Sequence, residues 1–153
     1  MKKLLIAALT VLSANAFAAD CTTSKEIQLP QWTIGKFENY RVYVSNVSDS
    51  AVDVEIKFYD SDKDRYLETS EAGTQFSYNA QFTANPALTS TSLAAGHTGR
   101  VTLHHGGVTQ YGLATISWTA QTCLPEALQA SVMYWTSDDD ALTWRDVNGG
   151  KAF

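Results

Sequence analysis

Apolar and polar residues alternate with a period of two along much of the chain, which is typical of strands that bury one face. The segment 51–60 is the clearest case, because large apolar residues and polar residues take turns throughout it. The apolar positions are Val52, Val54, Ile56 and Phe58, and the polar positions are Asp53, Glu55, Lys57 and Tyr59. This pattern predicts an antiparallel strand whose polar face is exposed to solvent.

Other segments repeat this alternation, and turn-forming residues separate them. The segments are 27–34, 40–45, 75–82, 100–105, 111–121, 128–136 and 142–147. The segments 111–121 and 128–136 are long and partly apolar on both faces, so we expect them in the middle of a sheet. The stretch 84–99 has the weakest pattern and is expected to be a long loop. No segment has a clear helical period.

These features predict an all-β protein with seven to nine strands. Antiparallel strands with one apolar face are naturally buried in a single Ig-like β-sandwich. A small closed β-barrel is the alternative. No internal repeat or linker divides the chain, so we expect one domain over residues 19–153.

Residues 1–18 are left out of that domain because they have the pattern of a secretory signal peptide. Met1-Lys2-Lys3 is a short basic segment, residues 4–12 are mainly apolar, and Ala16-Phe17-Ala18 fits a small-x-small cleavage site. Cleavage after Ala16 is the alternative. The apolar stretch is too short to span a bilayer, so we expect no transmembrane segment in the mature chain. Export to the periplasm, the cell surface or the medium follows.

The chain has two cysteines, Cys21 and Cys123, and both fall in the expected mature protein. All three destinations are oxidising, which predicts a disulfide between these residues. The bond would close a loop of about 100 residues and contribute up to roughly 4–5 kcal/mol in the chain-entropy treatment. Two free thiols or an intermolecular bridge are the alternatives.

The formal net charge is −5, and it becomes more negative if Lys2 and Lys3 leave with the leader. A negative chain without a Lys/Arg cluster repels phosphate, so nucleic acid is not an expected partner. Between residues 72 and 137 the only charged residues are Arg100 and Glu126. Neutral amides and hydroxyls form hydrogen bonds without a large desolvation cost. This surface therefore suits a protein or glycan partner at the cell envelope, although it is also common in secreted β proteins.

An acidic segment that follows the strand at 51–60 has the ligand spacing of a calcium-binding loop. The acidic residues fall at loop positions 1, 3, 5, 9 and 12, and they are Asp60, Asp62, Asp64, Glu68 and Glu71. Arg65 stands where glycine usually makes the sharp turn, and a strand rather than a helix precedes the loop. A solvated turn is therefore the alternative to calcium, which is the one cofactor that the sequence suggests. The acidic run at 138–140 could form a second loop of this kind.

Three aromatic residues near strand ends or turns are candidates for ligand binding: Trp32, Tyr111 and Trp144. An exposed ring can stack on a sugar while nearby amide or carboxylate groups bind its hydroxyls. Packing at the edge of the core is the alternative. Trp118 and Trp135 lie within long strands, so we expect them in the core.

No motif in the chain points to catalysis. The sequence has no GxSxG nucleophile elbow and no CxxC pair, and its acidic residues fall in expected turns rather than across a cleft. Adjacent residues of a strand point to opposite faces, so His104 and His105 would not readily share a metal ion. We therefore expect no enzymatic activity and assign no catalytic residue.

The region 40–119 resembles small bacterial Ig-like sandwiches. Three features carry the resemblance: Asn46-x-Ser48, the segment VDVEIKFYD at 52–60, and Leu93-Ala-Ala-Gly96-x-Thr98 before a strand. This order of strand, acidic turn and small-residue turn is similar to the sensory-rhodopsin transducer family over about half of the chain. That family lacks a secretion signal, so the resemblance implies a sandwich that interacts with a partner but not which partner.

Together these observations predict an exported, disulfide-linked β-sandwich that acts by binding. Two alternatives stay open: a calcium-assisted carbohydrate-binding or adhesin-like domain, and a structural subunit of the cell surface. Neither the ligand nor the oligomeric state follows from the sequence.

Overall fold

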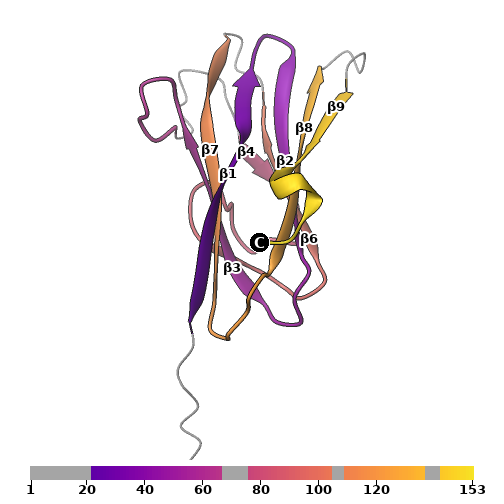
Figure 1. The fold of residues 1–153 in the computed structure, drawn as a ribbon. Helices are drawn as coiled ribbons and strands as arrows, with labels where there is room; N and C mark the ends of the chain where they lie inside the picture. Colours follow the sequence, from indigo (N-terminus) through magenta and orange to yellow (C-terminus); the bar gives the residue numbers. More distant parts are fainter. Residues whose placement is uncertain (1–21, 67–75, 105–108, 137–141) are drawn as a thin grey trace, which may run out of the picture.

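Two antiparallel sheets pack face to face in the computed structural model (Figure 1). The structure describes residues 22–66, 76–104, 109–136 and 142–153. Its elements are β1 (Thr23–Ile34), β2 (Glu38–Asn46), β3 (Val52–Tyr59), β4 (Phe76–Tyr78), β5 (Thr91–Leu93), β6 (Thr98–Leu103), β7 (Gln110–Ala120), β8 (Leu128–Thr136), β9 (Leu142–Asp146) and the single 3-10 turn η1 (Val147–Gly150). The four-stranded sheet has the order β1-β7-β3-β5, and the five-stranded sheet has the order β4-β6-β2-β8-β9. The predicted sandwich is confirmed, and the sheets do not close into a barrel.

Alternate residues of the long strands build the interior, as the period-two pattern predicts. In β3 the residues Val52, Val54, Ile56 and Phe58 are buried, while the residues between them are exposed or half-buried. Burial of one such side chain contributes about 1.5–3 kcal/mol. The alternation therefore decides which face of each strand points inward, because a slip by one residue would expose the whole apolar set.

Two segments differ from the prediction. The expected loop at 84–99 contains β5, which pairs with β3 and buries Leu93. Strand β4 ends at Tyr78, although the alternation continues to Phe82. Phe82 reaches the core from a turn, and its ring fills the space that a side chain at Gly99 would occupy. A three-residue strand and a buried turn residue leave too short a pattern for sequence periodicity to identify.

A β-bulge in β1 switches which residues of this strand face the interior. Leu29 and Trp32 are three residues apart, but their partners on β7 are two residues apart, so β1 carries one extra residue there. In an uninterrupted strand with Leu29 inside, Trp32 would point outward. The bulge instead buries Trp32 completely, and its indole N–H donates to the carbonyl oxygens of Tyr59 and Leu113, each at 3.0 Å.

Two tyrosine hydroxyls from the five-stranded sheet bind the bulge. Tyr40 on β2 donates to the carbonyl oxygen of Pro30 at 2.9 Å, and Tyr134 on β8 donates to that of Gln31. Burial raises the pKa of Tyr40 and of Tyr134, so both hydroxyls keep their protons at neutral pH. These bonds join the edge strand of one sheet to the middle of the other.

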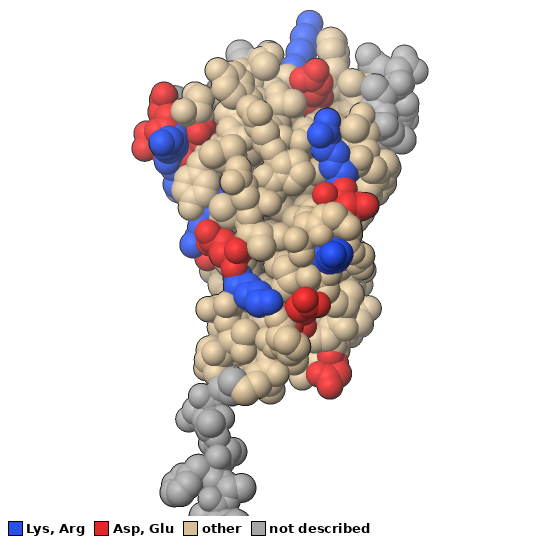
Figure 2. Space-filling view, in the orientation of Figure 1, with Lys and Arg blue, Asp and Glu red and all other residues tan. Residues whose placement is uncertain are grey.

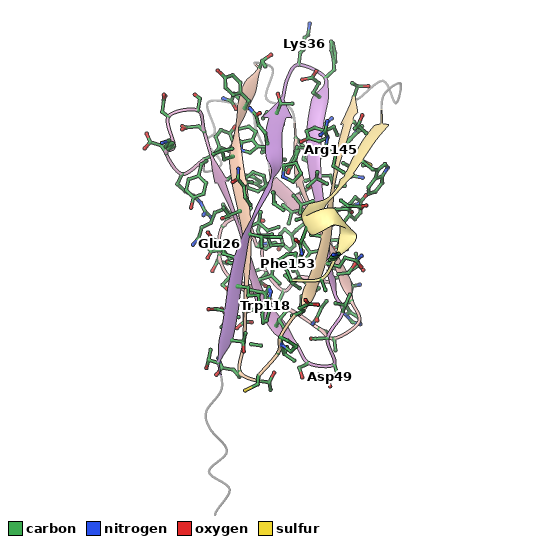
Figure 3. All side chains as sticks on the ribbon, in the orientation of Figure 1. Glu26, Lys36, Asp49, Trp118, Arg145 and Phe153 are labelled. Carbon is green, nitrogen blue, oxygen red and sulfur yellow. The ribbon has the colours of Figure 1, made fainter. Side chains whose placement is uncertain are left out.

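The C-terminal segment packs into the sandwich beside β8. Val147 and Phe153 are buried, and the backbone N–H of Phe153 donates to Leu128 at 2.8 Å. The carbonyl oxygen of Phe153 accepts the indole N–H of Trp118 at 2.9 Å, and both residues lie in the middle of the molecule in Figure 3. Within the described residues, no helix has the length and apolarity needed to cross a membrane.

Gly112 lets the backbone of Tyr59 approach the bulge. A Cβ atom at position 112 would lie 1.8 Å from the carbonyl oxygen of Tyr59, which also accepts the Trp32 N–H. We expect Gly112→Ala to lower the free energy of unfolding by about 3 kcal/mol in urea denaturation, as strong overpacking does. The matched control is Gly35→Ala, whose Cβ would meet the flexible end of Glu38 and should change stability by less than about 1 kcal/mol. Equal losses in the two variants would contradict the role of Gly112.

The strand register pairs residues that stand close in the sequence to the two cysteines. Thr23 pairs with Ala120, and these residues stand two positions after Cys21 and three positions before Cys123. Cys21 lies outside the described residues, so the bond stays a prediction.

Reduction of the native protein tests this disulfide. We expect a reductant to lower the thermal midpoint by several degrees, because the loss of a loop constraint of about 100 residues costs up to roughly 4 kcal/mol. Cys21→Ser and Cys123→Ser should each lower the thermal midpoint to a similar degree. The monomeric form of each variant, which has no disulfide, should not respond to the reductant. A wild-type midpoint that the reductant leaves unchanged would contradict the prediction.

Candidate binding groove

An open groove of about 770 Å³ lies between the edge strands β1 and β9. Residues from four strands line it: Pro30, Gln31, Thr33, Tyr111, Tyr134, Thr143 and Arg145. The groove thus joins the β1 bulge to residues from the last third of the chain. Its volume falls in the range of roughly 300–1,000 Å³ that is usual for small-molecule sites.

Neutral hydrogen-bonding groups make up most of this lining. The hydroxyl of Thr33 donates to Gln110 at 3.3 Å, and that of Tyr134 is held by Gln31. Tyr111, Thr143 and Gln31, which also carry neutral polar groups, line the same groove. The groove therefore offers donors and acceptors that a polar ligand could use.

Strand β9 has a different chemistry on each of its two faces. Thr143 and Arg145 line the groove, and the intervening Trp144 points to the opposite side because side chains alternate along a strand. There its ring stacks on Tyr43, with centroids 5.2 Å apart and an interplanar angle of 28°. Trp144 remains 54% exposed, while its partner across the strands, Met133, is buried.

The outer face of the five-stranded sheet carries a row of packed aromatic and cationic side chains. The guanidinium carbon of Arg41 lies 4.0 Å from the ring centroid of Trp135, and Arg41 also donates to the hydroxyls of Thr102 and Tyr43, each at 3.1 Å. Trp135 was expected in the core but is half-buried on this outer face. The core position expected for Trp118 is confirmed.

Arg145 has no counter-charge within hydrogen-bond or ion-pair distance among the described residues. The two ion pairs found among the described residues both involve Glu55. Asp146 follows Arg145 but belongs to the other face of β9, and Glu38 lines a smaller pocket that adjoins the groove. The guanidinium lies close enough to Tyr134 to oppose, in part, the burial that raises the pKa of that phenol. Charged side chains on this side of the molecule are dispersed over a mainly uncharged surface (Figure 2).

The structure brings one of the three predicted ligand-binding aromatic residues into the groove. Tyr111 lines it and is 53% exposed. Trp144 lies on the opposite side of β9. Trp32 is fully buried, which corrects the expectation that it is available at a strand end, because the bulge turns its ring into the core.

Sequence reasoning missed Arg145, Tyr134 and the two bulge residues. The alternation of Thr143, Trp144 and Arg145 is visible in the sequence, and it places Trp144 and Arg145 on opposite faces. Which of these faces meets a groove depends on how β9 sits against β1. That arrangement depends on the pairing of β1 with β7 and of β2 with β8, which are far apart in the sequence and leave no local periodicity.

The first part of the predicted calcium loop forms a tight turn after β3. One carboxylate oxygen of Asp60 accepts hydrogen bonds from the backbone N–H groups of Asp62 and Asp64, at 2.9 and 3.0 Å. Lys63 has a φ of 70°, which is unusual for a residue with a side chain. The Asp60 carboxylate therefore holds the turn in shape.

The next residue of the loop, Arg65, makes its contacts outside the turn. Arg65 donates to the carbonyl oxygen of Ala87 at 2.9 Å and lies 3.7 Å from Glu55, so its side chain is bound elsewhere. Glu68 and Glu71 lie outside the described residues. No group of three His, Cys, Asp or Glu side chains that could hold a metal ion is found among the residues described. Calcium binding by this loop stays a prediction.

Asp60→Ala separates a turn role from a calcium role. Loss of two backbone hydrogen bonds to a carboxylate should lower the free energy of unfolding by about 1–2 kcal/mol, and by the same amount with a chelator or with calcium. Asp62→Ala, which removes a carboxylate with no such bond, is the matched control and should be nearly neutral. A destabilisation of both variants that appears only in calcium would support the calcium loop instead.

The comparisons with known proteins add no relative. No protein-family model matches the chain, and neither a curated protein nor a solved structure shows significant similarity to it.

Proposed function

We propose that this protein is an exported, non-enzymatic binding module whose ligand site is the groove between β1 and β9. The groove itself carries the proposal, because it is a concave surface with open hydrogen-bonding groups and one half-exposed aromatic ring. Small-molecule sites generally combine such concavity with a few fixed polar groups.

The groove is held in shape before any ligand arrives. Its lining includes the bulge at Pro30 and Gln31, whose carbonyl oxygens accept hydrogen bonds from Tyr40 and Tyr134 respectively. Trp32 is anchored beneath by its two hydrogen bonds. A ligand would therefore meet a prearranged surface, which lowers the entropic cost of binding.

The side chains that line the groove suit binding better than proton transfer. A guanidinium group has no acceptor and does not take up a proton, and burial raises the pKa of Tyr134 further from neutrality. General acid–base catalysis works best with a group whose pKa lies near the working pH. Arg145 instead offers N–H donors to a ligand, whereas Tyr134 donates its hydroxyl to the carbonyl oxygen of Gln31.

A glycan or a protein of the cell envelope is the proposed partner class. The leader at 1–18 supports export, and the charge-poor sequence from 72 to 137 supports a partner recognised mainly by hydroxyl and amide groups. Sugars present many hydroxyls and an apolar ring face, which the groove can match with Thr143, Gln31 and the ring of Tyr111.

Filling the groove tests the proposed site. The exported protein and Thr143→Trp would be compared on an array of bacterial and host glycans, and retained glycans would be titrated in solution. We expect Thr143→Trp to weaken binding at least about tenfold, or 1.4 kcal/mol. Thr143 lies on an edge strand and is exposed, and tryptophan is favoured in strands, so the variant should fold.

Trp144→Thr on the same strand is the matched control. It removes the exposed ring from the opposite face of β9 and should leave groove binding within about twofold of wild type. Binding that depends on Trp144 but not on position 143 would move the site to the outer sheet face and overturn the groove proposal. Absence of retention on the glycan array and of a specific partner in envelope extracts would count against a binding module altogether.

A further inference from the structure

We propose that the groove recognises an acidic glycan, with a uronate carboxylate at Arg145 and the sugar ring against Tyr111. This inference rests on the proposed function and narrows its ligand to one chemical class. Three observations carry it: the unpaired guanidinium, the exposed ring, and the neutral hydroxyl and amide groups between them.

The first observation is that Arg145, unlike two other arginines, forms no hydrogen bond or ion pair with the described residues. Arg65 binds the carbonyl oxygen of Ala87 and approaches Glu55, and Arg41 is held against Trp135. In contrast, the guanidinium of Arg145 makes no hydrogen bond, ion pair or ring stacking contact in the described part of the chain, and its residue is exposed. It stands at the front of the molecule above Phe153 (Figure 3).

The chemistry of a guanidinium group then selects the ligand. Its planar fork of N–H donors matches a carboxylate in two parallel hydrogen bonds, which are stronger than bonds between neutral groups. The wall around Arg145 contains the phenol of Tyr134 and the hydroxyl of Thr143 rather than a carboxylate. A ligand carboxylate would therefore meet a cation whose charge no side chain of the lining neutralises.

The second and third observations favour a sugar acid over a simple anion. The ring of Tyr111 is 53% exposed and paired in the sheet with Thr33, so it offers an apolar surface at the same groove. Thr143 and Gln31 offer neutral donors and acceptors for sugar hydroxyls. A polyphosphate would meet only one guanidinium among the described residues of the groove lining, and the chain as a whole has a net charge of −5. Both features favour a lightly charged ligand.

Titration with trigalacturonate and with its methyl ester tests the inference directly. The two probes share ring, linkage and length, but the ester lacks the negative charges. Binding to the exported protein would be followed by calorimetry and by NMR shifts of Tyr111 and Thr143. We expect the acid to bind at least about tenfold more tightly than the ester, or 1.4 kcal/mol, and we expect added salt to reduce this difference.

Three arginine variants supply the matched comparison. Arg145→Gln should weaken trigalacturonate binding about tenfold and leave the affinity for the ester unchanged. Arg145→Lys should restore part of the loss, because it keeps the charge but not the fork. Arg100→Gln removes a cation from the outer face of the five-stranded sheet and should leave both affinities unchanged. The Nε of Arg100 is buried without a hydrogen-bond partner among the described residues.

Several outcomes would overturn the acidic ligand. They are equal affinity for acid and ester, an equal loss in Arg145→Gln and Arg100→Gln, shifts centred on Tyr43 and Trp144, and no binding of trigalacturonate at millimolar concentration. The groove proposal survives any of these if Thr143→Trp still abolishes the retention of another glycan. Failure of the two ideas can therefore be told apart.

Discussion

The extra residue in β1 is the constraint on which the rest of the sandwich depends. It lets Leu29 and Trp32 both face inward although they are separated by an odd number of positions. Without it, either the first half of β1 or the Trp32 ring would have to leave the core. The bulge also frees the carbonyl groups of Pro30 and Gln31 from the ladder with β7. The buried phenol of Tyr40 and the half-buried phenol of Tyr134 donate to them from the other sheet. The bulge therefore determines the packing of β1, its register with β7 and the hydrogen bonds between the two sheets.

The same point also shapes the groove. The bulged residues line the groove, and Tyr134, whose phenol donates to Gln31, belongs to the strand next to β9. Close approach at Gly112 keeps Tyr59 and Trp32 together directly behind this wall. A change in the bulge would thus alter both the stability of the fold and the shape of the candidate site. Edge strands are usually protected against pairing with other chains by bulges and proline, and the bulge with Pro30 serves β1 in this way as well.

Sequence periodicity could predict the long strands and the sandwich, because burial on one face leaves a repeated signal in β2, β3, β7 and β8. It could not predict β5 or the buried turn at Phe82, where three residues or one carry the burial. The shift from Ile27 and Leu29 to Trp32 and Ile34 is present in the sequence, but a change of parity next to a proline also fits the end of a strand. Hence Trp32 was expected at an edge and lies in the core. The groove was beyond sequence reasoning for a different reason, since it joins β1 to β9 and depends on which edges of two sheets come together.

Strand β9 shows how a short edge strand can serve two surfaces with unlike chemistry. Trp144 is held against Tyr43 and covers Met133, so its exposed ring has a structural use on the outer face. Arg145 has no comparable use on the groove side, where no described carboxylate pairs with it and the half-buried phenol of Tyr134 lies nearby. An exposed cation without a hydrogen bond or ion pair among the described residues costs little at the surface, but packing does not explain its presence. Exposure alone would have singled out the tryptophan, whereas the unused bonding capacity of each side chain singles out the arginine, and that capacity is the better guide to where a ligand completes the structure.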